Sequence, residues 1–160
     1  MSMNEEEKLR SIIEDYLKEA KMMHLATMRN GKPWICNVWF AADKDLNIYW
    51  FSSRGRRHSQ EVEDDPHVAA GIWIPSEPAD ESRGIQLEGT AERVTNPLEI
   101  AKAIAVYAGK IFTPQAVKQY MADRDYPHHF YRITPTSIVL FDTKNYPENS
   151  RRELKLSDNL

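Results

Sequence analysis

The stretch from Trp34 to Trp73 constrains the fold of this chain more than any other part of it. Apolar and aromatic residues run from Trp34 to Ala41, stop at the Asp43-Lys44-Asp45 turn, and resume from Leu46 to Phe51. Two apolar runs separated by a short polar turn are typical of a β-hairpin. The sequence therefore predicts a strand pair that leads directly into the polar loop at residues 52–59.

This loop holds the densest cluster of hydrogen-bond donors in the chain. Residues 52–59, SSRGRRHS, include three serines, three arginines and one histidine, and a short helix is predicted directly after them at 59–65. Arginine guanidinium groups match phosphate or carboxylate oxygens in a two-pronged geometry, and the free N–H groups of a helix start add to the same field. The residues alone predict an anion site, and a solvated surface turn is the alternative reading.

Further strands are indicated on both sides of this stretch. Asn30-Gly31 is a strong signal for a two-residue hairpin turn with positive φ at both positions. The strand after this turn carries apolar residues on both faces, so we expect both faces to be largely covered. The remaining predicted strands are 22–28, 67–74, 84–95 and two final strands, FYRIT and SIVLFD, broken at Pro135.

Helices are predicted at the N-terminus and before the last strands. Residues 4–20 show the apolar spacing of a helix with one buried stripe. Asn96-Pro97 and Thr113-Pro114 each combine an N-cap with proline at the first helical position, which predicts a helical hairpin. Residues 145–160 are polar and charged, and we expect a frayed tail there.

Composition limits the function classes that remain. A chain of 160 residues with 41% hydrophobic positions is large enough for one domain with its own core. A net charge of -3 argues against a nucleic-acid binder that relies on overall charge. The single Cys36 excludes an internal disulfide, and no apolar run is long enough to cross a bilayer, so we expect a cytoplasmic protein without membrane contact. The five histidines lack ligand-like spacing, so no metal site is predicted.

Several segments together resemble a known family. WICNVWF, IYWFSS, RRHSQEVEDDPHVAAGI and RGIQLEGTAERV look like the FMN-binding split β-barrel superfamily related to pyridoxamine phosphate oxidase, and in particular its small bacterial members. The shared features are a strand ending in a hydroxyl residue, a basic pair soon after it, and an acidic residue or Asn before proline. Here these are Ser52, Arg57-His58 and Asp65-Pro66.

The resemblance implies a fold and an assembly. It implies a mainly β protein with α insertions, namely a split β-barrel of six to seven antiparallel strands with an N-terminal helix and a helical hairpin before the last strands. Residues 1–144 would form a single FMN-binding domain, with 145–160 as a polar C-terminal tail. Relatives of this kind are usually homodimers with the flavin at the subunit interface.

The resemblance also implies a cofactor and its contacts. FMN would be held through its phosphate by Ser52, Arg57 and His58, with Ser53 and Arg56 as further donors. Many relatives in the superfamily have lysine where this chain has His58, and some small bacterial members resemble it in having an Arg-His pair. The remaining implied contacts, mainly to the flavin ring, are Asn37, Val38, Trp39, Phe51 and Gln86.

Three function classes stay open at this point. The first is an FMN-dependent oxidoreductase acting on a small molecule, with NADH or NADPH as candidate partner, although the substrate-binding segment of pyridoxamine phosphate oxidase itself is not evident. The second is a non-catalytic protein that binds flavin, haem or deazaflavin on the same barrel. The third and weakest is a nucleic-acid or protein interaction module that uses the arginines of the loop.

Overall fold

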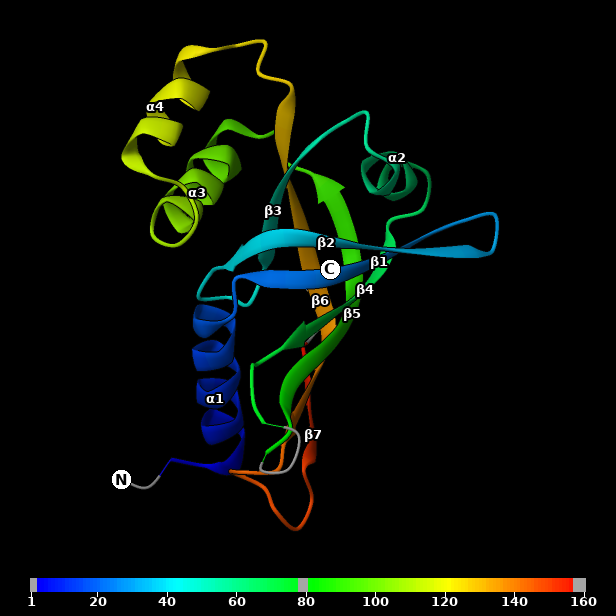
Figure 1. Cartoon of the computed structure of the whole chain (residues 1–160), viewed down its shortest axis with the longest axis vertical. Coiled ribbons are helices and arrows are strands. Elements are labelled where there is room, and N and C mark those ends of the chain that lie inside the picture. Colours follow the sequence, from blue (N-terminus) through cyan, green and yellow to red (C-terminus); the bar gives the residue numbers. More distant parts are fainter. Residues whose placement is uncertain (1–2, 78–80, 157–160) are drawn as a thin grey trace.

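Seven antiparallel strands form one sheet that closes on itself, and four helices surround it within the described residues, 3–77 and 81–156, of the computed structural model (Figure 1). The helix α1 runs beside the barrel, and α3 and α4 stand together at one end of it (Figure 1). The elements, in chain order, are α1 Glu5–Glu19, β1 Met22–Arg29, β2 Lys32–Ala42, β3 Ile48–Ser53, α2 Arg57–Asp64, β4 His67–Trp73, β5 Arg83–Arg93, α3 Pro97–Ala108, α4 Pro114–Ala122, β6 His128–Asp142 and β7 Arg151–Lys155.

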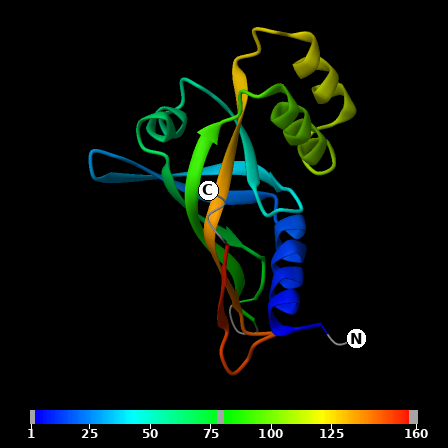
Figure 2. The same cartoon turned by 180° about the vertical axis from the view of Figure 1, so that it is seen from behind.

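Pairing between β3 and β6 closes the barrel. The strand order is β3-β2-β1-β4-β5-β6-β7, and β3 also pairs with the first part of β6, from Ile48↔Ile133 to Ser53↔His128. The second part of β6 turns away from β3 and pairs with β7 instead, as the view from behind shows (Figure 2). Closure removes the edges that an open sheet would expose. The predicted mainly β split barrel with an N-terminal helix and a helical hairpin is therefore confirmed.

The first hairpin forms as its turn sequence predicts. Asn30 and Gly31 have φ values of 53° and 72°, which is the left-handed conformation that a two-residue turn between twisted strands requires. The turn places β1 and β2 in register from Arg29↔Lys32 to Met22↔Trp39.

The predicted break at Pro135 is wrong, because β6 is one continuous strand. Pro135 lies opposite Gly89, where the register of β5 shifts between Glu88 and Gly89. A proline is tolerated at such a bulge because no regular ladder hydrogen bond is needed there. A Cβ atom at Gly89 would overlap the carbonyl oxygen of Thr134, so only glycine fits this crossing point of the two strands.

The expectation of a frayed tail is also wrong for residues 151–155. These residues form β7, which pairs with β6 from Ser137↔Lys155 to Phe141↔Arg151. Leu154 and Tyr146 are 4% and 6% exposed and belong to the main core together with residues of α1. One buried leucine in an otherwise charged strand is enough to dock it, because the strand pairs along the free side of β6.

The outer face of β2 is not covered, in contrast to the sequence-based expectation. Ile35 and Trp39 are 62% and 52% exposed, whereas Val38 and Phe40 on the other face are buried. Among the described residues α3 covers this face only at its end, where Ala41 packs with Ala103 and Tyr107, so Ile35 and Trp39 contact solvent in a single chain.

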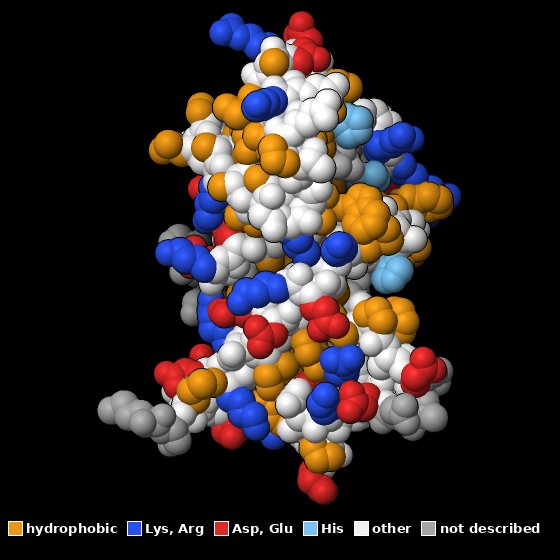
Figure 3. All heavy atoms as spheres, turned by 60° about the vertical axis from the view of Figure 1, so that its left-hand side comes forward, with side chains coloured by type: hydrophobic (Ala, Val, Ile, Leu, Met, Phe, Trp, Pro, Cys, Tyr) orange, Lys and Arg blue, Asp and Glu red, His pale blue; other side chains and the backbone are white. Residues whose placement is uncertain are grey.

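Two separate cores hold the molecule together. The main core fills the barrel and the inner face of α1, and includes Trp50, which is fully buried and stacks on Tyr131 at 5.0 Å. The second core lies beneath α3 and α4, where Phe51 and Phe130 are surrounded by aromatic side chains of the helical hairpin. The side of the molecule formed by α1 and this hairpin is shown in Figure 3, where Lys and Arg side chains gather between the two parts. Among the described helices, none is both long and apolar enough to span a membrane.

Candidate anion and cofactor site

The turn between β3 and α2 presents an open helix start. The N–H of Arg56 donates to the carbonyl of Ser53 at 3.1 Å, and the N–H of Gly55 donates to Ser53 Oγ at 3.3 Å. These bonds shape the turn so that α2 begins at Arg57. The N-cap residue Arg56 provides no side-chain cap. The N–H groups of the first helical turn therefore remain directed at an incoming anion.

Ser52 and His58 form a buried pair beside this helix start. His58 Nε2 and Ser52 Oγ lie 2.9 Å apart, and the two residues are only 8% and 7% exposed. Burial, with the nearby Arg56 guanidinium, lowers the pKa of His58 below its ordinary value, so the imidazole is neutral at neutral pH. A bound anion would offset both effects and favour the protonated ring.

Arg57 is fixed in place by two contacts. Its Nε donates to Glu61 Oε1 at 2.7 Å, and its guanidinium lies 4.1 Å from the ring centroid of Trp34. Glu61 is 1% exposed, and its other oxygen accepts from Thr27 Oγ1 at 2.6 Å. Burial would raise the pKa of Glu61, but the hydrogen bonds from Thr27 and Arg57 lower it overall, so the carboxylate stays charged. These bonds involve only Nε of Arg57, whose terminal N–H groups can still reach a ligand.

The other two arginines of the loop differ in their surroundings. Arg54 forms an ion pair with Glu63 at 3.2 Å, which occupies its guanidinium. Arg56 is exposed and has no ion pair in the part of the chain that the structure describes. Ser53 Oγ accepts from Gly55, so its hydroxyl proton can still be donated. The structure therefore brings Ser52, Ser53, Arg56, Arg57 and His58 to one loop and helix start.

Two of the expected ring contacts, Asn37 and Gln86, lie on the outer face of the sheet. Asn37, His24, Gly71 and Gln86 are cross-strand neighbours on β2, β1, β4 and β5, so they form a row. His24 Nδ1 lies 2.6 Å from Asn37 Oδ1. Within residues 3–77 and 81–156 no hydrogen bond joins this row to the Ser52–His58 pair. Asn37 and Gln86 thus share a face and form a second cluster, separate from the Ser52–His58 pair.

The other three expected contacts are Val38, Trp39 and Phe51. The side chains of Val38 and Phe51 point into the protein cores, and the carbonyl of Trp39 already accepts a hydrogen bond. Val38 is 9% exposed and faces the barrel interior. The Trp39 carbonyl accepts from Tyr107 Oη at 2.7 Å, although its indole is exposed. Phe51 lies in the aromatic core, 5.1 Å from Phe112 between ring centroids. Only the backbone of Val38 and Phe51 can reach a ligand from these positions.

Sequence reasoning missed the residues that support the loop. The spacing of four between Arg57 and Glu61 on a helix is a usable signal for their ion pair. The contributions of Trp34 and Thr27 depend on how α2 lies against the first hairpin, which the sequence does not reveal. Cys36 lies nearby, and burial together with the Glu61 charge raises the pKa of its thiol to about 11, so the thiol is uncharged at neutral pH.

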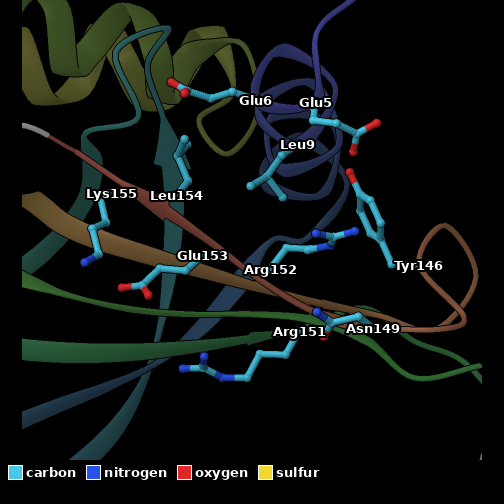
Figure 4. A pocket seen from close by; sticks show the side chains of 10 residues that line it. All are labelled: Glu5, Glu6, Leu9, Tyr146, Asn149, Arg151, Arg152, Glu153, Leu154 and Lys155. Carbon is cyan, nitrogen blue, oxygen red and sulfur yellow. The ribbon is translucent and has the colours of Figure 1, made fainter.

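The cavity between α1 and β7 is unrelated to this loop. It has a volume of about 520 Å³ and is lined by side chains from both elements and by Tyr146 (Figure 4). Its three acidic and three basic residues oppose one another, so it has no charge preference for an ion. Among the described residues, no group of three or more His, Cys, Asp or Glu side chains is placed to hold a metal ion.

Comparisons with known proteins agree with this fold. A family model described as pyridoxamine 5'-phosphate oxidase matches residues 9–141. No curated protein matches the chain in sequence. Among solved structures, a heme binding protein from Mycobacterium smegmatis is 20% identical with a TM-score of 0.72, covering 97% of this chain and 59% of that chain.

Two further structures have the same fold. The heme storage protein HutZ from Vibrio cholerae is 18% identical with a TM-score of 0.63, covering 78% of this chain and 88% of that one. General Stress Protein 26 from Bacillus anthracis is 19% identical with a TM-score of 0.65, covering 92% and 98%. At these identities the neighbours show the fold alone, whereas the family model spans most of the chain. The chain therefore belongs to the pyridoxamine 5'-phosphate oxidase family of split β-barrel proteins.

Proposed function

We propose that this protein binds FMN and carries out two-electron oxidation or reduction of a small molecule. The observation that carries this proposal is Arg57, which a buried carboxylate and an indole ring hold at an open helix start. Exposed ion pairs contribute little to stability, so an arginine with only a structural role at the surface would not require a buried carboxylate as its partner. A fixed guanidinium beside free helix N–H groups is suited to a phosphate.

The donors present fit a phosphate monoester. Ser52, Ser53, Arg56, Arg57 and His58 supply hydroxyl, guanidinium and imidazole donors on one loop. When His58 is protonated, its Nε2 must donate to Ser52 Oγ, which leaves the Ser52 hydroxyl proton for the ligand. When bound, FMN supplies the two-electron chemistry, and the protein supplies its position and electrostatic surroundings. NADH or NADPH is the candidate electron donor.

Flavin retention in loop variants tests this proposal. The purified protein would be incubated with excess FMN and desalted, and its visible absorption and the FMN dissociation constant would be measured. We expect Arg57→Ala to weaken FMN binding about tenfold or more, because it removes a charge-assisted bidentate contact. Arg54→Ala is the matched control on the same loop, since Arg54 is already paired with Glu63.

The outcome of this comparison shows whether the loop binds the FMN phosphate and whether the bound flavin is catalytic. Equal FMN affinity in wild type, Arg57→Ala and Arg54→Ala would overturn the proposed phosphate site. Retained flavin that NADH and NADPH both fail to reduce without oxygen would favour a non-catalytic flavoprotein instead.

We further propose that the protein is a homodimer whose outer sheet faces meet, with the cofactor at the interface. Trp39 on β2 pairs with Met22 on β1, and Trp73 lies on β4 two residues beyond Gly71, the partner of His24 on β1. The side chains of Trp39, Met22 and Trp73 are 52%, 39% and 60% exposed. Exposed apolar side chains gathered on one sheet face in this way mark an interaction surface rather than a solvated one.

A haem-binding function is a second candidate, favoured by His24. This exposed histidine lines a cavity of about 460 Å³ together with Trp73 and Phe141. Its Nδ1 contacts Asn37 Oδ1, which orients the ring, so Nε2 of His24 is the atom that would hold a haem iron. Two of the similar structures are described as a heme binding and a heme storage protein.

Haem titration distinguishes this candidate from the flavin site. Hemin would be added to the flavin-free protein, and a shifted Soret band would be followed in wild type, His24→Ala and His67→Ala. His67 is the matched control, because it is an exposed histidine paired with Asp65 away from the cavity. Loss of the band in His24→Ala alone would support the haem site, and an unchanged band would exclude His24 as the ligand.

A further inference from the structure

A third cavity lies where α1, the turn after β2 and the helix α3 meet. It has a volume of about 590 Å³, within the range of about 300–1,000 Å³ usual for small-molecule sites. Ala42 and Val106 are half-buried and supply the accessible apolar surface, next to Leu17, Leu46 and Ala41, which are almost fully buried. Its lining includes none of the residues of the 52–58 loop or of the outer-face row.

Lys110 is the charged group built into the lining of this cavity. Its Nζ donates to the carbonyl of Leu17 at 2.7 Å, at the last turn of α1, and lies 4.0 Å from the ring centroid of Phe40. The side chain is half-buried and forms no ion pair with a carboxylate in the described part of the chain. One of its three N–H donors is used, so two remain without a protein acceptor.

The charges around the cavity are mainly positive. Four lysines and two acids line it, namely Lys18, Lys44, Lys102 and Lys110 with Glu14 and Asp43. Both acids are already paired, Asp43 with Lys102 at 2.9 Å and Glu14 with Arg10 at 3.1 Å. Figure 3 shows Lys and Arg side chains gathered across this middle part of the molecule. The cavity therefore has an apolar surface and an uncompensated positive charge.

We propose that this cavity binds a small amphipathic carboxylate. The carboxylate accepts from the Lys110 ammonium, and the hydrocarbon part lies against Ala42 and Val106. An anion supplies the charge that this half-buried ammonium lacks, and apolar contact removes the exposed parts of Ala42 and Val106 from water. A neutral apolar molecule would leave the ammonium unpaired, so the site selects for an acid.

The pH dependence of binding follows from the surroundings of Lys110. Burial, together with the Lys21 charge, lowers the pKa of Lys110 to about 8. The other charged groups facing it are Lys18 and Glu14 from α1, Lys44 and Asp43 from the turn after β2, and Lys102 from α3. A bound carboxylate raises this pKa, so ligand affinity is highest below pH 8 and falls as the pH rises above it.

Calorimetric titration with octanoate tests the proposal. We expect octanoate to bind at pH 7 and to bind at least about tenfold more weakly to Lys110→Met, which keeps the apolar length and removes the charge. Lys118→Met is the matched control, because Lys118 is an exposed lysine on α4 outside the cavity. Octanol, which has the same chain without the charge, should bind weakly to wild type and variant alike.

The wild-type protein provides a test that does not depend on the variant folding. Octanoate affinity should fall between pH 7 and pH 9.5, and excess FMN should leave it unchanged. Affinity that is the same at both pH values, equal for octanol, or unaffected in a folded Lys110→Met would overturn the proposal. Displacement of octanoate by FMN would show that the two ligands share a site, and would overturn the proposal of a separate carboxylate site.

Discussion

His58 is the residue whose charge couples the proposed anion site to pH. Its pKa is lowered by burial and by Arg56, so the folded protein holds fewer protons on this ring than the unfolded chain. This residue alone therefore makes the ligand-free protein less stable as the pH falls below about 6.5. A bound phosphate has the opposite effect, because it favours the protonated ring.

We predict that FMN affinity falls as the pH rises from about 5 to 8, because the bound phosphate raises the pKa of His58 and this gain is lost once the ring is neutral; a rise of about one pKa unit corresponds to a tenfold fall. The measurement is the FMN dissociation constant by flavin fluorescence at each pH. His58→Asn retains a hydrogen-bonding side chain but does not titrate, so its slope reports the phosphate group of FMN alone. Parallel slopes for wild type and His58→Asn would show that His58 does not contact the phosphate.

At the same scale, the sequence predicted that the candidate residues lie on one loop, but it did not predict their burial or their contacts. Ser52 and His58 were expected on one loop and they do form a contact. The burial of His58 could not be predicted, because it depends on packing between β3 and α2. The support of Arg57 by Glu61, Trp34 and Thr27 likewise involves three different elements.

At the scale of elements, β7 belongs to the barrel domain although its charged sequence does not indicate a strand. Leu154 is 4% exposed and packs with Tyr146 and Leu9 of α1 in the main core. We predict that Leu154→Ala lowers the free energy of unfolding by about 2–5 kcal/mol, the usual cost of such a truncation in a core. Chemical denaturation followed by fluorescence measures it.

The neighbouring residue provides the comparison for this prediction. Lys155 is exposed on the same strand, so Lys155→Ala should change stability by no more than about 0.5 kcal/mol. A Leu154→Ala protein as stable as Lys155→Ala would mean that β7 does not dock on the barrel in solution.

The elements also show why local signals predicted some strands and not others. Asn30-Gly31 determines the first hairpin within a few residues, and this hairpin has the expected turn. The strand β7 depends on pairing with β6, and its own residues are charged except Leu154. Likewise Pro135 is locally a strand breaker, and only the facing Gly89 makes a continuous β6 possible.

At the scale of the whole molecule, the outer sheet face is the surface that a single chain leaves incomplete. Its apolar side chains come from two paired groups, Trp39 with Met22 on β2 and β1, and Trp73 with Gly84 and Phe141 on β4, β5 and β6. The polar row with Asn37 and Gln86 lies next to these groups. The side chains proposed to contact the cofactor therefore lie next to those proposed to form the dimer interface, on one face of the sheet.

We predict that the wild-type protein is a dimer at micromolar concentration and that Trp39→Ser combined with Trp73→Ser makes it monomeric. Each indole is more than half exposed in the single chain, and large aromatic side chains are the groups that contribute most to interface affinity. Light scattering coupled to size-exclusion chromatography measures the mass directly. The control is Leu98→Ser with Met121→Ser, since these side chains are 81% and 69% exposed on α3 and α4 and lie away from the sheet face.

FMN affinity, measured in the Trp39/Trp73 variant and in the Leu98/Met121 control, tests whether FMN binding depends on the dimer. If the cofactor lies at the interface, the Trp39/Trp73 variant should lose FMN together with its partner, although the 52–58 loop is unchanged. A monomer that still binds FMN with wild-type affinity would place the whole cofactor site within one chain. A dimer that survives both tryptophan substitutions would assign the interface to another surface, because the outer sheet face would then have lost its two largest apolar side chains without consequence.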